Sequence, residues 1–329
     1  MRFKFPRETL KYSSSSSLKR FFITSTLATA SVLQPFIDVS EGKMFTVDPY
    51  TIKVGGLMVY GGKLYGTAYS YYDADGNQVL SHYRSALNLS VKGDVQGMYE
   101  VGSLGAGFVS GYMTAIPSAW QSAFGGPVLT GQCCLAIISR TSYGPAVSVF
   151  DPNDLGVKNP VPDIPLVYYP SNHPLADWSA TSPYFNGSTE IKGMVFPQNT
   201  RSVLFFGRHG IGTFCYGPGT SDPTLAGKPA PGGIDSYCYD PEDSSKGTHA
   251  YPYVSQVWGY DAAALLQVKN GQVQPWSVQP YAVWSLHVPI AGAFRIGGAT
   301  YDPQTGRIFV SQECADTDCL PVIHVFQAP

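Results

Sequence analysis

The sequence predicts an all-β fold made of four repeated hairpin units, and two observations support this prediction. A short apolar strand that opens on glycine and turns back into a second apolar strand recurs along the chain, with first-strand glycines at positions 56, 111, 193 and 298. The chain also contains 35 glycines and 26 prolines, which suits a fold with many tight turns. Units of this kind, one after another, are typical of the blades of a β-propeller. We therefore expect a four-bladed β-propeller over residues 31–329.

The unit at residues 191–210 shows the pattern most clearly, in the sequence IKGMVFPQNTRSVLFFGRHG. Its expected strands, Gly193–Phe196 and Ser202–Phe206, flank a Pro-Gln-Asn turn. Glycine at the start of the first strand suits a place where two backbones approach closely. In the second unit we expect an insert at Ser118–Gln132, with a helical turn at Ser118–Phe124, followed by a second strand at Cys134–Arg140.

The two ends of the chain are expected to complete the ring. The last unit has only three expected strands, the third at Pro321–Phe326, whereas Ser31–Ile37 is an apolar strand without partners before it. We expect this N-terminal strand to supply the missing fourth strand, which would hide edges that invite aggregation. An open or incomplete propeller is the alternative.

Residues 1–30 differ from the rest of the chain and predict a leader. They are basic, contain Ser13–Ser17, and continue into a short apolar run that ends in an Ala-x-Ala sequence. A secretory signal, a transit peptide and a disordered leader all fit this composition. We expect a secreted or periplasmic protein that is a monomer.

Charge argues against a nucleic-acid partner. Residues 1–37 hold six basic side chains and one acid, so the remaining chain has 15 basic and 22 acidic residues, a net charge of −7. A body of that sign is a poor nucleic-acid binder. Apolar runs stay shorter than the roughly 20 residues that span a membrane.

The six cysteines predict two loop-closing disulfides. Cys215 with Cys238 brackets a long loop, and Cys314 with Cys319 brackets Ala-Asp-Thr-Asp, which implies an oxidising compartment. Cys133 and Cys134 are expected to be free core thiols, with a vicinal disulfide as the alternative. The chain lacks Cys-x-x-Cys and His-x-His spacings, so we expect neither a metal site nor a cofactor.

Two local sequence patterns have less specific meanings. Asp73-Ala-Asp75-Gly76-Asn77 resembles the start of a calcium loop, but no Glu follows at the position of the last ligand. Asp-Gly between strands predicts a hairpin turn on its own. The sequons Asn88-Leu-Ser90 and Asn186-Gly-Ser188 are glycosylation acceptors only in a eukaryotic secretory context.

The ends of the second strands are expected to converge at one face and to form a polar funnel. Arginine there would bind a carboxylate, a phosphate or sugar hydroxyls. Arg208-His209 is the strongest pair because it interrupts an apolar strand, and the loop Phe214–Thr248 that follows is a candidate lid. The candidate ligand-binding residues are Arg208, His209, Arg140, Tyr72, Asp73, His249, Gln312 and Glu313. Each also has a structural alternative, such as turn capping by Asp73.

Five stretches resemble one family of proteins. They are KVGGLMVYGGKLYGTAYSYYD, CCLAIISRTSYGPAVSVF, RSVLFFGRHG, KGTHAYPYVSQVWGYDA and IGGATYDPQTGRIFVSQ. The chain resembles, over residues 31–329, an uncharacterised group of mostly bacterial, exported β-propeller-like proteins. The resemblance carries no assigned chemistry. Members of the group have a further hairpin unit before the position of Ser31, which implies a five-bladed family from which this chain has lost one blade.

Three functions are consistent with these patterns. The first is an exported propeller that binds a small polar or carbohydrate ligand in its funnel. The second is a hydrolase or lyase acting on a carbohydrate-like substrate through Arg208, His209 and nearby acids, of which Asp73 and Glu313 have the expected positions. The third is a structural or interaction scaffold. Whether the protein is an enzyme stays open, because the chain has no Gly-x-Ser-x-Gly elbow and no other catalytic set.

Overall fold

The computed structural model describes residues 52–71, 73, 75–88, 91, 93–134, 141–288 and 295–328. The protein is all-β, with 43% of the described residues in strands and 11% in helices. The leader at residues 1–30 and the expected strand Ser31–Ile37 lie outside the described residues.

Four antiparallel sheets form the body of the protein. In each of them, strands that are consecutive along the chain lie side by side, apart from one long insertion between β10 and β14. The first sheet contains β1 (Ile52–Tyr60), β2 (Lys63–Ser70), β3 (Leu80–Ala86) and β4 (Gln96–Glu100). The second contains β5 (Tyr112–Ala115), β6 (Val128–Gly131), β7 (Val147–Phe150) and β8 (Asp163–Val167). The third contains β9 (Glu190–Val195), β10 (Ser202–Gly210), β14 (Tyr253–Asp261) and β15 (Ala282–Ser285). The fourth contains β16 (Ile296–Asp302), β17 (Arg307–Gln312) and β18 (Val322–Gln327).

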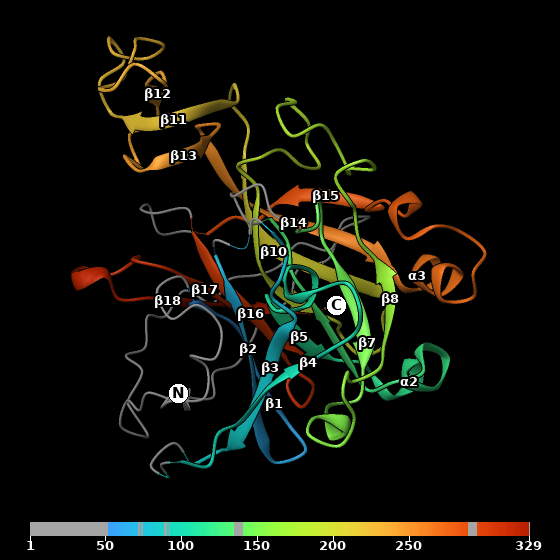
Figure 1. Ribbon diagram of the computed structural model, residues 1–329. Coiled ribbons are helices and arrows are strands. Elements are labelled where there is room, and N and C mark those ends of the chain that lie inside the picture. Colours follow the sequence, from blue (N-terminus) through green and yellow to red (C-terminus); the bar gives the residue numbers. More distant parts are fainter. Residues whose placement is uncertain are drawn as a thin grey trace, which may run out of the picture.

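The insertion between β10 and β14 forms a small sheet of its own, which we call the extension (residues 211–252). It contains β11 (Cys215–Thr220), β12 (Cys238–Tyr239) and β13 (Lys246–His249), and Figure 1 shows it projecting from the body at the top left. The sequence predicted a loop over most of this region. Because β12 has only two residues and the chain on either side of it is irregular, no strand pattern was visible there.

The first strands of the four sheets contact one another. Neighbouring contacts join β1 to β5, β5 to β9 and β9 to β16, and further contacts join β1 to β9 and β5 to β16. Glycine permits this closeness: a Cβ atom on Gly55 would lie 1.8 Å from the carbonyl oxygen of Ser110, and one on Gly193 would lie 2.3 Å from the backbone nitrogen of Ala299. The expectation that first-strand glycines mark close backbone approach is confirmed for Gly56 and Gly193, whereas a Cβ atom on Gly298 would meet nothing closer than 3.8 Å.

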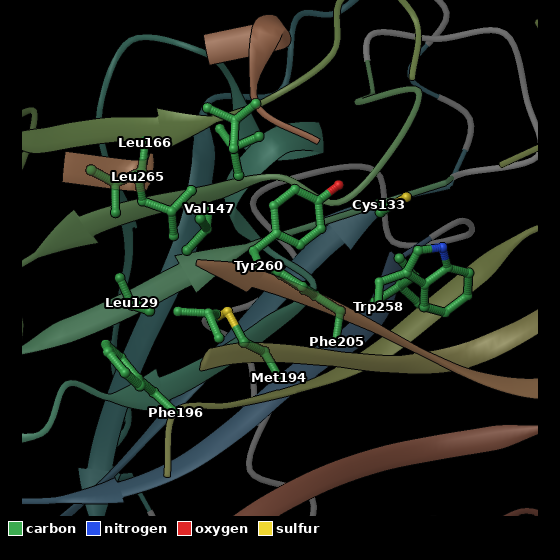
Figure 2. Packing of buried hydrophobic residues seen from close by; sticks show 14 of the residues in the cluster. Leu129, Cys133, Val147, Leu166, Met194, Phe196, Phe205, Trp258, Tyr260 and Leu265 are labelled. Carbon is green, nitrogen blue, oxygen red and sulfur yellow. The ribbon is translucent and has the colours of Figure 1, made fainter. Parts of the chain in front are cut away.

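The third sheet is buried on both faces, which explains the unbroken apolar run in β10. Val203 and Phe205 pack into the core shared with the second sheet, whereas Leu204 and Phe206 pack into the core shared with the fourth. Figure 2 shows the first of these cores, with Leu129 of β6, Val147 of β7, Leu166 of β8, Phe205 of β10 and Trp258 of β14 meeting in one interior. A strand between two cores reads as continuously apolar instead of alternating.

The short helices lie between the strands. They are α1 (Ala106–Val109), α2 (Ser118–Phe124) and α3 (Ala262–Lys269), with 3-10 turns η2 (Pro152–Asp154), η3 (Pro275–Ser277) and η4 (Thr317–Cys319). Asp261 caps α3, because its side chain accepts a 2.9 Å hydrogen bond from the Ala263 backbone N–H. In the part of the chain that is described, no helix is both long and apolar enough to cross a membrane.

The second unit departs from its predicted strands. The helical turn at Ser118–Phe124 is confirmed. The second strand of this sheet is β6 at Val128–Gly131 and not the predicted Cys134–Arg140, most of which lies outside the described residues. Cys134 has φ of 75°, which takes the backbone out of the β region directly after Cys133 bridges to Ile191. Residues 135–140 are not among the described residues.

Three disulfides join the six cysteines. Cys215–Cys238 and Cys314–Cys319 are paired as predicted. The prediction that Cys133 and Cys134 are free thiols is wrong, because the two form a vicinal disulfide. The left-handed backbone at Cys134 is what separates this dipeptide from an ordinary strand, in which adjacent side chains point to opposite faces.

Candidate functional site

Charged side chains gather at the end of the third and fourth sheets where β9 and β16 begin and β10 and β17 end. We call this group the charged cluster; its members are Glu190, Lys192, Arg208, Arg295 and Glu313. β9 contributes Glu190 and Lys192, whose charges act on each other; Lys192 is the extra residue at a shift of register between β9 and β10. Arg208 lies opposite Glu190 in the β9–β10 register, and its Nη2 atom is 2.8 Å from Glu190 Oε1.

Arg208 is almost fully buried, with 5% of its surface exposed. Its guanidinium lies 4.4 Å from the centre of the Tyr253 ring, a cation–π contact. Burial disfavours the charged guanidinium, but Glu190, Tyr253, Asp243 and Asp240 together outweigh it and the pKa of Arg208 is raised. The Nε atom of Arg208 and the hydroxyl of Ser255, which lies opposite it on β14, are buried without a hydrogen-bond partner.

Glu190 is largely removed from water, although 32% of its side chain is exposed. Burial raises the pKa of its carboxyl, but Arg208, Lys192 and Arg295 lower it by more, so the net pKa lies below the ordinary value. Glu190 is therefore ionised, and its second oxygen is not used by the ion pair with Arg208.

The ammonium of Lys192 makes no hydrogen bond or ion pair with another residue that the structure describes, and the side chain is half-buried. Burial lowers its pKa, but the nearby Tyr69, Glu190, Glu313 and Tyr71 outweigh this, so that the pKa is raised and the side chain stays charged. The three N–H donors of Lys192 therefore lie near two carboxylates and hydrogen-bond to neither.

His209 does not share a site with Arg208. Adjacent residues of a strand point to opposite faces, so Arg208 faces the fourth sheet while His209 packs edge-on against Trp258 toward the second. The Nε2 atom of His209 donates to the Ser182 carbonyl at 2.7 Å, and Nδ1 accepts from the Thr189 hydroxyl at 2.9 Å. Burial lowers its pKa, so this histidine is neutral with both ring nitrogens in use.

His249 belongs to the extension and reaches the charged cluster through other residues. Its Nδ1 atom lies 2.7 Å from Asp240 Oδ2, and the Tyr253 hydroxyl donates to the same carboxylate oxygen at 2.6 Å. Arg295 adds a second link, because its Nη2 atom is 2.6 Å from Asp243 Oδ2 in the extension. These contacts tie residues 240–249 to the strands that carry the cluster.

The remaining predicted residues have separate surroundings. Both carboxylate oxygens of Asp73 accept turn N–H groups, from Asn77 at 2.8 Å and from Gln78 at 3.2 Å. Gln312 is buried, with its Oε1 atom 2.8 Å from His324 Nε2. Glu313 is exposed, and its negative charge raises the pKa of Lys192. Arg140 and Tyr72 lie outside the described residues. The ligand-binding roles of these residues stay predictions.

Glu190 and Lys192 were missed by the sequence predictions. The signal was present in Thr189-Glu190-Ile191-Lys192-Gly193, where two charges alternate with apolar residues at the start of a glycine-led strand. It was overlooked because attention fell on the ends of the second strands and not on the beginnings of the first strands.

Two further sequence patterns have clear surroundings. Asn186 of the second sequon is 1% exposed, and its Nδ2 atom donates to the Gly210 carbonyl at 2.8 Å. Within the described residues, no group of three or more His, Cys, Asp or Glu side chains is placed to hold a metal ion.

Comparison with known proteins yields only weak similarities. Neither a protein-family model nor a curated protein matches the sequence. A luciferin-regenerating enzyme has a TM-score of 0.36 and 8% identity, over 85% of this chain and 63% of its own. An acylaminoacyl peptidase in complex with a chloromethyl ketone has a TM-score of 0.33 and 10% identity, over 87% of this chain and 32% of its own. The acylaminoacyl peptidase of Pyrococcus horikoshii has a TM-score of 0.32 and 8% identity, over 84% and 31%. The chain thus spans less than two thirds of each of these proteins, and such similarities carry no argument about function.

Proposed function

We propose that this protein is an exported, four-bladed β-propeller that binds a neutral polyhydroxylated molecule, such as a carbohydrate, at its charged cluster. The propeller is supported by the contacts among the four first strands and by the antiparallel order of the sheets. The resemblance to exported propeller-like proteins is part of the same proposal. A five-bladed ancestor and closure by residues 31–37 are finer versions of it.

Lys192 carries the ligand proposal. Its charged ammonium lies near Glu190 and Glu313 and is bonded to neither, so a ligand that binds all three groups accepts from the lysine and donates to the carboxylates. A hydroxyl group does both. An anion would be repelled by Glu190 and Glu313, and a cation would be repelled by Lys192, Arg208 and Arg295. A neutral polyol avoids both penalties, which favours sugars over phosphates and organic acids.

The test is a thermal-shift screen against neutral sugars, sugar acids, inorganic phosphate and divalent metals. We expect stabilisation of the wild type by at least one neutral sugar, since a ligand that binds only the folded state raises its stability. Lys192→Met should abolish the shift while leaving the free protein folded. Lys63→Met, in the exposed turn between β1 and β2, is the matched control and should respond like the wild type.

A screen in which Lys192→Met and the wild type respond alike would contradict the proposed site. A shift produced by phosphate or sugar acids, but by no neutral sugar, would contradict the proposed ligand chemistry.

One observation favours a second candidate, a hydrolase. Glu190 and Glu313 both act on Lys192, so two carboxylates flank the same point, as glycoside hydrolysis requires. In that case Glu190→Gln would lose turnover of a chromogenic glycoside by about 10² or more while still binding it. Sugar binding without turnover in the wild type would favour the binding protein over the hydrolase. The charged cluster favours a protein that binds a ligand over a structural scaffold.

Export is supported by the three disulfides, which fit an oxidising compartment. We propose a secreted or periplasmic protein that loses its basic leader. Intact mass of the protein from the culture medium or periplasm is the measurement, and a full-length mass in the cytosolic fraction alone would contradict export.

A further inference from the structure

The extension is attached to the charged cluster by a buried polar network. Its anchor is Asp240, which directly follows β12 and is 1% exposed. Asp240 Oδ1 accepts the backbone N–H groups of Glu242 and Asp243 at 2.9 and 3.1 Å, and Oδ2 accepts the Tyr253 hydroxyl at 2.6 Å. The Tyr253 ring then covers the guanidinium of Arg208, which holds Glu190. Contacts therefore run without a gap from the extension to the cluster.

His249 completes this network and must carry two ring protons. Its Nε2 atom is 3.1 Å from two backbone carbonyl oxygens, those of Gly217 and Ser245, and a carbonyl only accepts. Its Nδ1 atom faces Asp240 Oδ2, a carboxylate oxygen that already accepts from Tyr253. With donors around Asp240 holding the negative charge there, the shared proton resides on Nδ1, and His249 is an imidazolium.

Loss of one ring proton would cost a buried hydrogen bond. The Nδ1 proton stays beside the charged carboxylate of Asp240, so the proton that leaves is the one on Nε2. The bare Nε2 lone pair would then face the carbonyl oxygens of Gly217 and Ser245 at 3.1 Å, and water cannot replace the lost donor because the His249 side chain is 3% exposed. His249 would have to move away from these oxygens, and β13 would leave β11, which carries Gly217 and pairs with His249 opposite Cys215.

We propose that His249 is a proton-operated latch: when doubly protonated it holds β13 against β11 and keeps Asp240 in place below Tyr253 of β14, and it thereby regulates the charged cluster. The latch itself stands on the contacts within the extension. Only its effect on ligand affinity rests on the proposed function.

The charged surroundings set the direction of the effect. Asp240 and Asp243 face His249 from the segment between β12 and β13, Tyr253 faces the pair from β14, and Arg208 faces the acids from β10. Burial lowers the pKa of His249, but the hydrogen bond and charge of Asp240 raise it by more, to a net value above 6.5. Burial raises the pKa of Asp240, but its hydrogen bonds lower it by more, to a net value below 3.8.

The sign of the pH dependence follows from these two directions. A raised histidine pKa contributes stability that is complete below the unfolded-state value and is lost as pH rises through the folded-state value. A lowered carboxyl pKa contributes stability that is lost as pH falls through the folded-state value. The latch is therefore closed between these limits and opens on the alkaline side of 6.5.

The first test reads the proton directly. In ¹⁵N-labelled wild-type protein near neutral pH, ring-nitrogen spectra should show both nitrogens of His249 protonated, assigned by loss of the signal in His249→Gln. A singly protonated ring would overturn the proposal. This arm uses the wild type, so it remains decisive if a variant fails to fold.

The second test reads the extension. Hydrogen-exchange protection of residues 213–249, corrected for the intrinsic rate, should fall about tenfold or more between about pH 6 and about pH 9 in the wild type. Asp240→Asn keeps the shape of the side chain and removes its charge, so the pH-dependent step should vanish. His173→Gln, an exposed histidine stacked on Trp276, is the control and should keep the step. A step that survives in Asp240→Asn, or protection that is flat in the wild type, would overturn the latch.

Neither arm needs a ligand, so failure of the latch and failure of the proposed function are distinguishable. If a sugar is found for the charged cluster, its affinity should decline over the same pH range in the wild type and stay level in Asp240→Asn. Sugar binding without this parallel decline would remove the regulatory part of the proposal.

Discussion

Arg208 shows how a single buried charge can be acceptable in an apolar strand. Its cost of burial is offset by three features that converge on it: the carboxylate of Glu190, the face of Tyr253 and the negative charges of Asp240 and Asp243. The residue has a structural role, because its ion pair fixes the position of Glu190.

Replacement of Arg208 by methionine should therefore destabilise the protein by about 2 kcal/mol at neutral pH, less than a fully buried pair would cost because Glu190 is partly solvated. The reason is the carboxylate of Glu190, which loses its main counter-charge. Denaturant unfolding is the measurement, and adding Glu190→Gln to the variant should restore part of the loss.

Acid should reduce the difference in unfolding free energy between Arg208→Met and the wild type. The lowered pKa of Glu190 means that the wild type loses stability as pH falls below 4.5 through the folded-state pKa. In the variant the carboxyl takes up a proton at higher pH and its penalty disappears. A difference in unfolding free energy that stays constant down to about pH 3 would show that Glu190 is not the cause.

At the scale of single residues the sequence was only partly predictive. Arg208 stood out because charge in an apolar strand demands a partner, and Glu313 was placed at the correct strand end. Arg208 and His209 were predicted to act together, but the alternation of a strand separates them, and sequence alone does not say that both faces of β10 are buried. Lys192 was missed although its alternation with Glu190 before Gly193 is visible in the sequence.

The extension is the element whose stability depends most on one covalent link. Cys215–Cys238 joins residues 23 apart in sequence, across strands that supply few apolar contacts. By loop-closure entropy the bond contributes roughly 3 kcal/mol. Cys215→Ser/Cys238→Ser should therefore open the extension without unfolding the four sheets.

Limited proteolysis checks this expectation, since cleavage within residues 216–237 should become much faster than in the wild type. Cys314→Ser/Cys319→Ser removes a disulfide from the fourth sheet and should leave cleavage of the extension unchanged. Equal cleavage in all three proteins would mean that packing holds the extension and that the disulfide adds little.

Elements with strong local signals were predicted well. The turn at residues 197–200, the helix at Ser118–Phe124 and the last strand all correspond to observed elements. The second strand of the second unit was misplaced because Cys134–Ser139 is more apolar than Val128–Gly131. The residue types around Cys134 give no indication of its positive φ. The extension was predicted as loop because its sheet is short and rich in glycine and proline.

At the scale of the whole molecule, contact between first strands decides how the four sheets sit together. The β9–β16 contact offers a matched pair of glycines. A Cβ on Gly193 would come within 2.3 Å of the backbone of Ala299, whereas a Cβ on Gly298 would meet nothing closer than 3.8 Å. Gly193→Ala should force the third and fourth sheets apart and cost about 3 kcal/mol or more. Gly298→Ala should be neutral or slightly stabilising.

Thermal and denaturant unfolding of the two variants distinguish a tight contact from a loose one. Equal stability of Gly193→Ala and Gly298→Ala would show that the sheets can move apart at this contact. It would also remove the main support for an arrangement of the four first strands around one axis.

The repetition of glycine-led hairpins was enough to predict an all-β chain. Ring closure and blade number depend on relations between distant units, and a single sequence does not record them.

The burial of Asn186 has a consequence for how the protein is best produced. A eukaryotic secretory host presents this sequon to its glycosylation machinery while the chain is still unfolded. A glycan on Nδ2 would take the place of the N–H that bonds the Gly210 carbonyl and would need room at a residue that is 1% exposed. Glycosylated molecules would be unable to complete the third sheet, and quality control would retain them. A bacterial host, in which this sequon is silent, should therefore secrete more native protein than yeast or insect cells.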